Sequence, residues 1–375
     1  MEAILREPAG ATRLLMMESL RRNDRVLDRL AAEALAAAGR DVARTLMIEA
    51  LTSDATAFGK IGPVALPALT HLLEDDDSRV RGRAAWALGE MGPAAEIAIP
   101  MLVKSLRDED GLIRCFAASA LAKIGLAALP ILTELLKDKD EHLRRTVAEV
   151  VGNIGPEAEM AVPALMELLS DKDHFVRQTA ARALGNIGPG AKTAVPALTE
   201  LLKHETRQKA ETDVPFRTPL LGYTGIREDV ALALGRIGQD AKSAVPTLTE
   251  LLSDKEVSVR QAAALAIRNI GPVATVAAPA LTKSLGDENG AVRALAAFAL
   301  GRIGSDAAPA IPTLTELLND KEGSVRQAAA WALGEIGFSV HEDQNTAEAI
   351  GEDPGRPWQA SRNRKNATGV GFGVP

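Results

Sequence analysis

A proline that opens a similar helical segment recurs along most of the chain, and its spacing restricts the possible folds more than any other feature. The prolines are Pro67, Pro100, Pro130, Pro163, Pro196, Pro246, Pro279 and Pro312, separated by 33, 30, 33, 33, 50, 33 and 33 residues. Each begins a pattern such as PALTELLKHE, where proline suits the first helical turn because its missing N–H would have no partner there. This period predicts an array of short helical units.

A second helical segment follows each first one after an acidic turn, and is clearest in VRQAAAWALGEIG from Val325 to Gly337. It ends each time near a glycine, the residue expected at a helix stop. If its first apolar residue is position 0, positions 4, 7, 8 and 11 are apolar in every copy, and at about 100° per residue they fall on one face. Each unit is therefore helix, turn, helix and stop, and it buries its apolar face by stacking on its neighbours.

The residues within the unit separate the possible repeat families. The chain has neither the TPLHxA string of ankyrin repeats nor the WxxLGxxY string of tetratricopeptide repeats. The pairing of PALTELL with VRxAAxALGxIG resembles the short HEAT-like repeats of phycobilisome lyases and their bacterial relatives, and it extends from Ala50 to Gly337. The resemblance implies an all-α fold, an α-α superhelix or HEAT/armadillo-like solenoid of helix-turn-helix repeats about 33 residues long.

This resemblance divides the chain into three parts. Residues 1–49 are expected to form capping helices, and residues 50–337 a solenoid in which a degenerate first copy, ALTSDATAFGKIG, precedes eight repeats. For residues 338–375, which are rich in Gly, Asn and charge, we expect disorder, with at most a short turn near Thr346 to Ile350.

The spacing of 50 residues between Pro196 and Pro246 predicts an insertion at about residues 203–226. Pro215 and Pro219 argue against a continuous helix, so we expect a protruding loop. Phe216 and Tyr223 make this segment unusually aromatic for the chain, which indicates a partner-binding loop. The alternative is a surface insertion without a function.

Composition and charge exclude several classes of protein. The formal net charge of -7 opposes binding to nucleic acid, which requires a basic face. No uninterrupted apolar run reaches about 20 residues, and the start MEAILREPAG has no secretory signal pattern, so no membrane association is expected. One cysteine, Cys115, allows no internal disulfide, which is typical of a reducing compartment. These features predict a cytoplasmic protein.

An arginine occupies position 1 of all eight second helices. The residues are Arg81, Arg114, Arg144, Arg177, Arg227, Arg260, Arg293 and Arg326. This row could bind an anion. The alternative is structural: each arginine follows an acidic turn whose carboxylates and carbonyls can accept its donors. We favour the structural interpretation and predict a ladder that holds repeat to repeat.

Positions 2, 6 and 10 of the second helices vary while the rest of the unit stays constant, and we call them the concave stripe. In HEAT-like solenoids the second helices line the concave surface, so the resemblance implies that the concave stripe binds a protein or peptide. Aromatic and charged side chains are the usual anchors of such interfaces. The candidates are Trp86, Glu90, Lys123, Arg145, Arg182, Arg236, Phe298, Arg302, Trp331 and Glu335. The alternative for the three aromatic residues is packing between repeats.

Enzymatic relatives with this repeat provide a second hypothesis. The resemblance also covers deoxyhypusine hydroxylases, which hold two iron ions with His-Glu pairs at positions 2 and 3. This chain has pairs such as Gln178-Thr179 there, and neither position is a histidine in any of the eight repeats. His204-Glu205 and His341-Glu342 fall in the insertion and the C-terminal segment. We therefore predict no catalytic, metal or cofactor site. The function predicted is a non-catalytic scaffold or adaptor for an unknown protein, and the alternative is a bilin lyase or chromophore chaperone.

Overall fold

The structure is a computed structural model that describes the backbone of residues 66–212 and 225–351 and the side chains of residues 66–207 and 225–337. Within these ranges the chain forms helices joined by turns, with no strands. The predicted capping helices of residues 1–49, the degenerate first repeat, Phe216 and Tyr223 lie outside the described residues, as do residues 352–375.

Eight helix pairs follow one another in the described part of the chain. The first helices are α5 (Leu66–Leu72), α7 (Ile99–Ser105), α9 (Leu129–Leu135), α11 (Val162–Leu168), α13 (Val195–Thr212), α15 (Val245–Leu251), α17 (Ala278–Ser284) and α19 (Ile311–Glu316). The second helices are α6 (Ser78–Glu90), α8 (Gly111–Ile124), α10 (Glu141–Ile154), α12 (His174–Ile187), α14 (Ile226–Ile237), α16 (Val257–Ile270), α18 (Gly290–Ile303) and α20 (Gly323–Gly351).

Short 3₁₀ helices connect each second helix to the first helix of the next repeat. They are η3 (Gly92–Ala98), η4 (Gly125–Ala128), η5 (Gly155–Ala161), η6 (Gly188–Ala194), η8 (Gly238–Ala244), η9 (Gly271–Ala277) and η10 (Gly304–Ala310), and η11 (Leu317–Asn319) extends α19. Most have seven residues, but η4 has four, which accounts for the single spacing of 30 residues.

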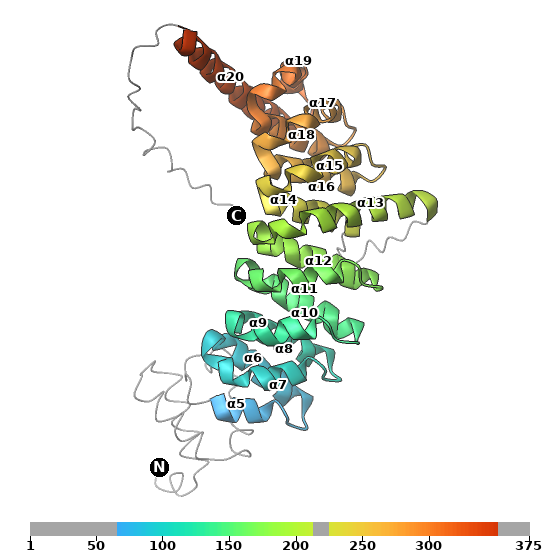
Figure 1. The fold of residues 1–375 in the computed structure, drawn as a ribbon, viewed down its shortest axis with the longest axis vertical. Helices are drawn as coiled ribbons and strands as arrows, with labels where there is room; N and C mark the ends of the chain where they lie inside the picture. Colours follow the sequence, from blue (N-terminus) through green and yellow to red (C-terminus); the bar gives the residue numbers. More distant parts are fainter. Residues whose placement is uncertain (1–65, 213–224, 352–375) are drawn as a thin grey trace, which may run out of the picture.

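The helix pairs stack along one long axis and form an elongated solenoid (Figure 1). Consecutive second helices pack side by side over most of their length, whereas consecutive first helices have few or no direct contacts. The second helices therefore form the more closely packed layer of the solenoid, which we call the inner layer. The α-α superhelix predicted from the sequence is confirmed.

Prolines and glycines have the roles that the sequence predicts. Pro100 and Pro130 are each the second residue of a first helix, and the other six prolines occupy the same place. Seven of the repeat-ending glycines have positive φ, a conformation that suits glycine because it has no Cβ. They are Gly92, Gly125, Gly155, Gly188, Gly238, Gly271 and Gly304.

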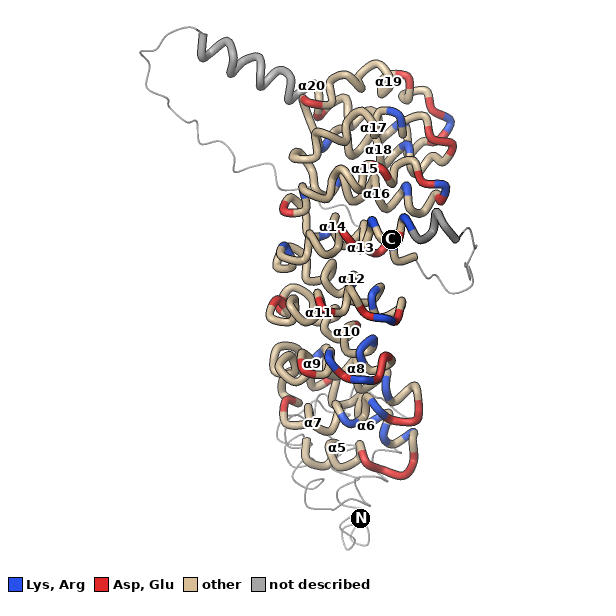
Figure 2. Tube along the Cα trace, turned by 45° about the vertical axis from the view of Figure 1, so that its right-hand side comes forward, with Lys and Arg blue, Asp and Glu red and all other residues tan. Residues whose placement is uncertain are grey.

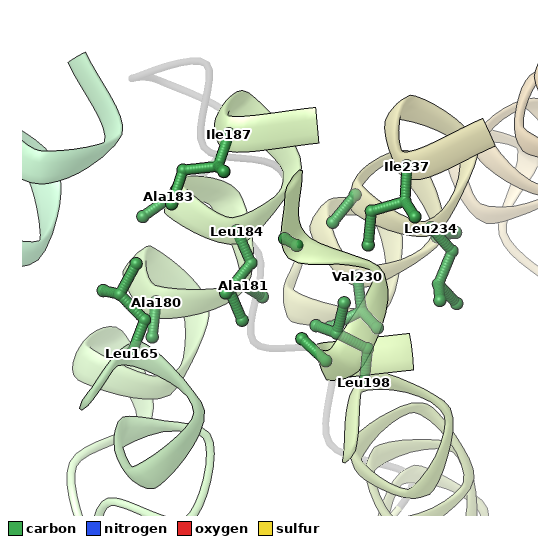
Figure 3. Close-up of a cluster of buried hydrophobic side chains, with 14 of the residues drawn as sticks. Leu165, Ala180, Ala181, Ala183, Leu184, Ile187, Leu198, Val230, Leu234 and Ile237 are labelled. Atoms are coloured by element: carbon green, nitrogen blue, oxygen red, sulfur yellow. The ribbon is translucent and has the colours of Figure 1, made fainter. Parts of the chain in front are cut away.

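The apolar positions of neighbouring repeats meet in one continuous core. Figure 3 shows Ala180 and Leu184 of α12 and Val230 and Leu234 of α14 in one cluster of apolar side chains, and all four are buried. These residues occupy the predicted core positions. Stacking therefore buries the face that a single helix pair would leave in water.

Glycine at position 9 of a second helix lets the next one approach closely. A Cβ placed on Gly235 would lie only 2.6 Å from the Cα of Ala266, and one on Gly185 would lie 2.7 Å from the Cα of Ala233. The structure shows that glycine on one helix and alanine on the next act together.

The insertion differs from the predicted loop in its first ten residues. Helix α13 continues without interruption to Thr212, because residues 203–212 are mostly good helix formers and the first proline after Pro196 is Pro215. The two prolines that predict a loop lie in 213–224, outside the described residues. The insertion thus begins as a longer first helix.

The C-terminal end also differs from the prediction. Helix α20 continues through Gly337 to Gly351 and includes the segment from Thr346 to Ile350, where the sequence predicted disorder with at most a short turn. Each of the seven glycines with positive φ is followed by a 3₁₀ helix that leads into another repeat. After Gly337 no such segment follows, so nothing requires the chain to turn there.

Two described stretches, Gly111–Leu135 and Val257–Ser284, are long and apolar enough by length and composition to cross a membrane. Each contains a second helix, a glycine with positive φ, a 3₁₀ helix and the next first helix. The chain therefore changes direction inside both stretches. Their apolar residues serve the core between repeats.

Candidate partner-binding surface

The turns between first and second helices form one edge of the solenoid, where acidic and basic residues alternate (Figure 2). In each of the seven turns that the structure describes, an aspartate accepts a backbone N–H two residues later, as Asp171 does from Asp173 at 2.8 Å. Asp173 then caps α12 by accepting the N–H of Val176 at 2.9 Å. The acidic turns are thus explained by capping, which satisfies the free N–H groups at a helix start.

The arginines at position 1 connect these turns to one another. Arg144 donates from Nε and Nη2 to the two carboxylate oxygens of Asp171 in the next repeat, at 2.7 and 2.9 Å. Its Nη1 donates to the carbonyls of Asp138 and Lys139 in its own turn, at 2.8 and 3.0 Å. Arg81, Arg260 and Arg293 form the same arrangement. The predicted structural ladder is confirmed.

The pKa values of the ladder follow from these contacts. Burial acts to raise the pKa of Asp171, but hydrogen bonds from Arg144 and from the Asp173 N–H outweigh it and lower the pKa below its ordinary value. The pKa of Asp108 is lowered in the same way, with Arg81 and Asp110 as its donors. Both carboxylates are therefore ionised at neutral pH and paired with a guanidinium.

The ladder varies at four of the eight repeats. Arg227 pairs with Asp254 through Nη1, and Arg326 donates to carbonyls of its own turn. Arg177 pairs with Glu205 at 2.9 Å, because the longer α13 takes the place of an acidic turn. Arg114 donates to the carbonyls of Asp108 and Glu109 in its own turn. The carboxylate of the next turn, Asp138, instead accepts from Arg107 at 2.6 Å.

The concave stripe lies on the inner layer of second helices and is narrower than the sequence predicts. Position 10 is exposed in all eight second helices, but position 2 is buried in four of them. Gln178, for example, donates from Nε2 to Asp229 of the next second helix at 2.6 Å and is buried. The surface available to a partner therefore consists mainly of positions 6 and 10.

The candidate residues of the concave stripe differ in exposure. Seven charged members are exposed, namely Glu90, Lys123, Arg145, Arg182, Arg236, Arg302 and Glu335. Trp86, Phe298 and Trp331 are half-buried and pack against the core. The aromatic residues thus fill space between repeats and still present part of their surface to a partner.

The candidates separate into groups along the solenoid. At the N-terminal end, Lys123 donates to Glu90 at 2.6 Å across one repeat. In the middle, the guanidinium of Arg145 lies 5.9 Å from the ring centre of Phe175. The structure brings four candidates together only at the C-terminal end.

An open groove of about 810 Å³ runs along the C-terminal part of the inner layer. We call it the C-terminal groove. The candidates that line it are Arg236, Phe298, Arg302 and Trp331, together with Arg268 and Asn269. The rings of Phe298 and Trp331 pack with their centres 5.4 Å apart, and the guanidinium of Arg268 lies 6.0 Å above Phe298. The groove is therefore lined by a pair of aromatic rings and by three arginines.

A family model of HEAT repeats matches residues 55–110, 99–162, 135–213, 223–290 and 278–352. These matches cover well over half of the chain. The chain belongs to the HEAT repeat family. A comparison with curated protein sequences found no match.

Solved structures similar to this HEAT repeat protein include two engineered proteins and a lyase. One engineered protein is 24% identical, with 87% of this chain and 98% of its own covered and a TM-score of 0.48. The second is 22% identical, with 73% and 97% covered and a TM-score of 0.34. The complex of CpcE and CpcF of phycocyanin lyase from Nostoc sp. PCC7120 is 27% identical, with 72% and 94% covered and a TM-score of 0.36.

Sequence reasoning missed Arg268 and Asn269 as groove residues. Asn269 occupies position 10 of the concave stripe, but an uncharged polar side chain is not among the usual anchors of an interface. Arg268 occupies position 9, where six of the eight HEAT repeats have glycine. The replacement of glycine by arginine at position 9 could have been noticed in the sequence, because an arginine there serves neither the core nor the ladder.

The structure describes the side chains of one of the two His-Glu pairs, His204-Glu205. His204 is exposed, but Glu205 is buried and bonded to Arg177. Among the residues that the structure describes, no three His, Cys, Asp or Glu side chains gather as a metal site would require. The only described cysteine, Cys115, is exposed at position 2 of α8.

Proposed function

We propose that this HEAT repeat protein is a non-catalytic scaffold or adaptor that binds a partner protein along the concave stripe. One observation carries the proposal: the variable positions 6 and 10 form a row on the inner layer, and several of their charged side chains, among them Glu149, Arg182 and Arg302, form no ion pair within the described residues. A repeat protein that recognises a partner keeps its core positions similar from repeat to repeat and varies the exposed positions on one surface. Positions 6 and 10 vary in this way.

The electrostatics of the concave stripe support a protein partner. Its charges are mixed, with Glu90, Glu149 and Glu335 exposed beside the arginines. Mixed charge favours orientation and specificity between proteins, whereas a phosphate backbone requires a basic surface. We place this function in the cytoplasm, which agrees with a single exposed thiol.

Affinity purification with the full chain tests the proposal. We compare the wild type with a Trp86→Ala, Trp331→Ala variant and with Arg182→Glu, whose side chain is exposed and has no ion pair within the described residues. The expected result is loss of the same captured proteins in both variants, because aromatic anchors and charge both determine interfaces. Circular dichroism checks that both variants fold.

A Glu134→Ala, Glu250→Ala variant is the matched control, since both glutamates lie on first helices, away from the concave stripe. It should capture the same proteins as the wild type. Identical partner sets for all four proteins would refute binding through the concave stripe. Uptake of a bilin with visible absorption by the purified chain would instead support the alternative function of a chromophore lyase or chaperone.

A further inference from the structure

The chain contains two kinds of arginine, and their surroundings differ. Six of the eight at position 1 are buried or half-buried and bonded to carboxylates, as Arg144 is to Asp171. Those on the inner layer are exposed or half-buried, and within the described residues none of them forms an ion pair. The residues are Arg145, Arg182, Arg236, Arg268 and Arg302. Ion pairs with carboxylates account for most of the arginines at position 1, whereas the arginines of the inner layer have no acidic partner within the described residues.

Four of these cations stand on four consecutive second helices. Arg182 lies on α12, Arg236 on α14, Arg268 on α16 and Arg302 on α18. The contacts that the structure gives them are neutral: Arg236 donates to the side-chain oxygen of Asn186, and Arg268 lies near Phe298. The acidic residue of the C-terminal groove is Asp240, which also forms no ion pair within the described part. Three arginines and one carboxylate therefore line the groove, which leaves it with a net positive charge.

An apolar platform lies at the C-terminal end of this row. The ring of Trp331 is accommodated because position 9 of α18 is Gly301, where a Cβ would lie 2.6 Å from Cζ3 of the indole. Trp331 and Phe298 remain half-buried on the surface of the groove. Partly exposed aromatic pairs of this kind can bury one large apolar side chain of a partner.

We infer that the C-terminal groove binds an extended acidic segment of a partner protein that carries one large apolar side chain, a proposal that rests on the function proposed above. The arginines of α14, α16 and α18 pair with the carboxylates of that segment, and Phe298 and Trp331 receive the apolar side chain.

The spacing of the cations favours a polypeptide over a polyphosphate. Packed helices lie about 8–10 Å apart and an extended chain rises about 3.3 Å per residue, so one repeat corresponds to about three residues of a bound peptide. Asn186 and Asn269 occupy position 10 on alternate helices, and their amides both donate and accept, as peptide groups do. A polyphosphate carries a negative charge at every unit and would need a cation opposite each one. This surface offers about one cation per repeat, with neutral amides between the cations.

Selection from a display library of random peptides on the immobilised full chain tests the inference. Peptides of about twelve residues are long enough to span four repeats at about 3.3 Å per residue. The expected result is enrichment of sequences that contain several Asp or Glu and one large apolar residue. A fluorescein-labelled peptide from that set should bind about tenfold or more weakly to an Arg236→Gln, Arg302→Gln variant, because charge-assisted contacts are lost.

The control variant, Arg79→Gln with Lys283→Gln, removes the same charge at sites outside the groove, so binding should change less than about twofold. Binding to the wild type should also weaken as salt is raised from about 50 to about 500 mM. Three outcomes would overturn the inference: enrichment of neutral or basic peptides, equal loss in the control, or tighter arginine-dependent binding of a labelled oligothymidine. If no peptide is enriched while affinity purification still captures stripe-dependent partners, the inference fails and the proposed function stands.

Discussion

At the scale of single residues, one side chain can join two repeats and close its own turn at the same time. Arg144 does so with donors directed at Asp171, Asp138 and Lys139. A lysine carries one compact charge and could not form this fork. The ladder therefore depends on the guanidinium geometry as much as on charge, which explains why position 1 is arginine in every repeat.

Replacing Arg144 by alanine should destabilise the protein by about 3–5 kcal/mol, because it leaves the enclosed carboxylate of Asp171 without its partner. Arg326→Ala is the matched control, since the bonds of Arg326 go to carbonyls of its own turn and their loss should cost about 1 kcal/mol. Urea unfolding followed by circular dichroism measures both. Equal losses would show that the bond between repeats contributes nothing beyond the bonds within the turn.

The ladder should also make the free energy of unfolding depend on pH. The pKa values of Asp108 and Asp171 are lowered in the folded protein, whereas an unfolded aspartate titrates near about 3.9. The unfolded state therefore binds more protons, so the stabilisation is complete above about pH 5 and is lost as the pH falls through the folded pKa values.

Urea midpoints measured between about pH 7 and about pH 2.5 test this dependence. An Arg144→Ala, Asp171→Ala variant removes one of the pairs and should show a shallower fall in stability below about pH 4 than the wild type. Parallel curves for the two proteins would contradict a contribution of this pair to the acid response.

At the scale of helices, the sequence predicts the frame well because proline and glycine act locally. Pro100 and Gly92 have the positions expected from the chemistry of their own residues. The end of α20 was not predictable in this way, because Gly337 stops a helix only where another repeat packs beyond it. The groove also depends on contacts between helices. The sequence shows that position 9 of α16 is Arg268 instead of glycine, but it does not show that Phe298 of the neighbouring helix lies beside that arginine.

Glycine at position 9 should be required only where another repeat follows. Gly235→Ala places a Cβ 2.6 Å from the Cα of Ala266 and should cost about 1–3 kcal/mol by overpacking. Gly334 holds the same position in α20, and no described atom lies within 4 Å of the point that a Cβ would occupy there. Gly334→Ala should therefore stabilise the protein by about 0.5–1 kcal/mol. Thermal unfolding of the two variants gives the comparison, and destabilisation by both would refute the packing argument.

At the scale of the whole molecule, the contact between repeats is not uniform. The backbones of helices α8 and α10 lie close together over a shorter stretch than those of any other consecutive pair of described second helices. Three features coincide there: η4 is short, position 9 of α8 is Ala122, and the bonds of Arg114 go to its own turn. A solenoid held by nearest-neighbour contacts is weakest where such a contact is poorest.

We therefore expect the solenoid to open first between α8 and α10. Native-state hydrogen exchange with mass spectrometry should show α6 and α8 exchanging together, with a lower opening free energy than α10 to α18. An Arg144→Ala variant should weaken the junction of α10 with α12 and reduce the difference between the two blocks, whereas Arg79→Gln, at an exposed turn, should leave it unchanged. Protection that falls smoothly from the centre of the array to both ends, with no step at α8, would contradict a weak junction and indicate ordinary fraying.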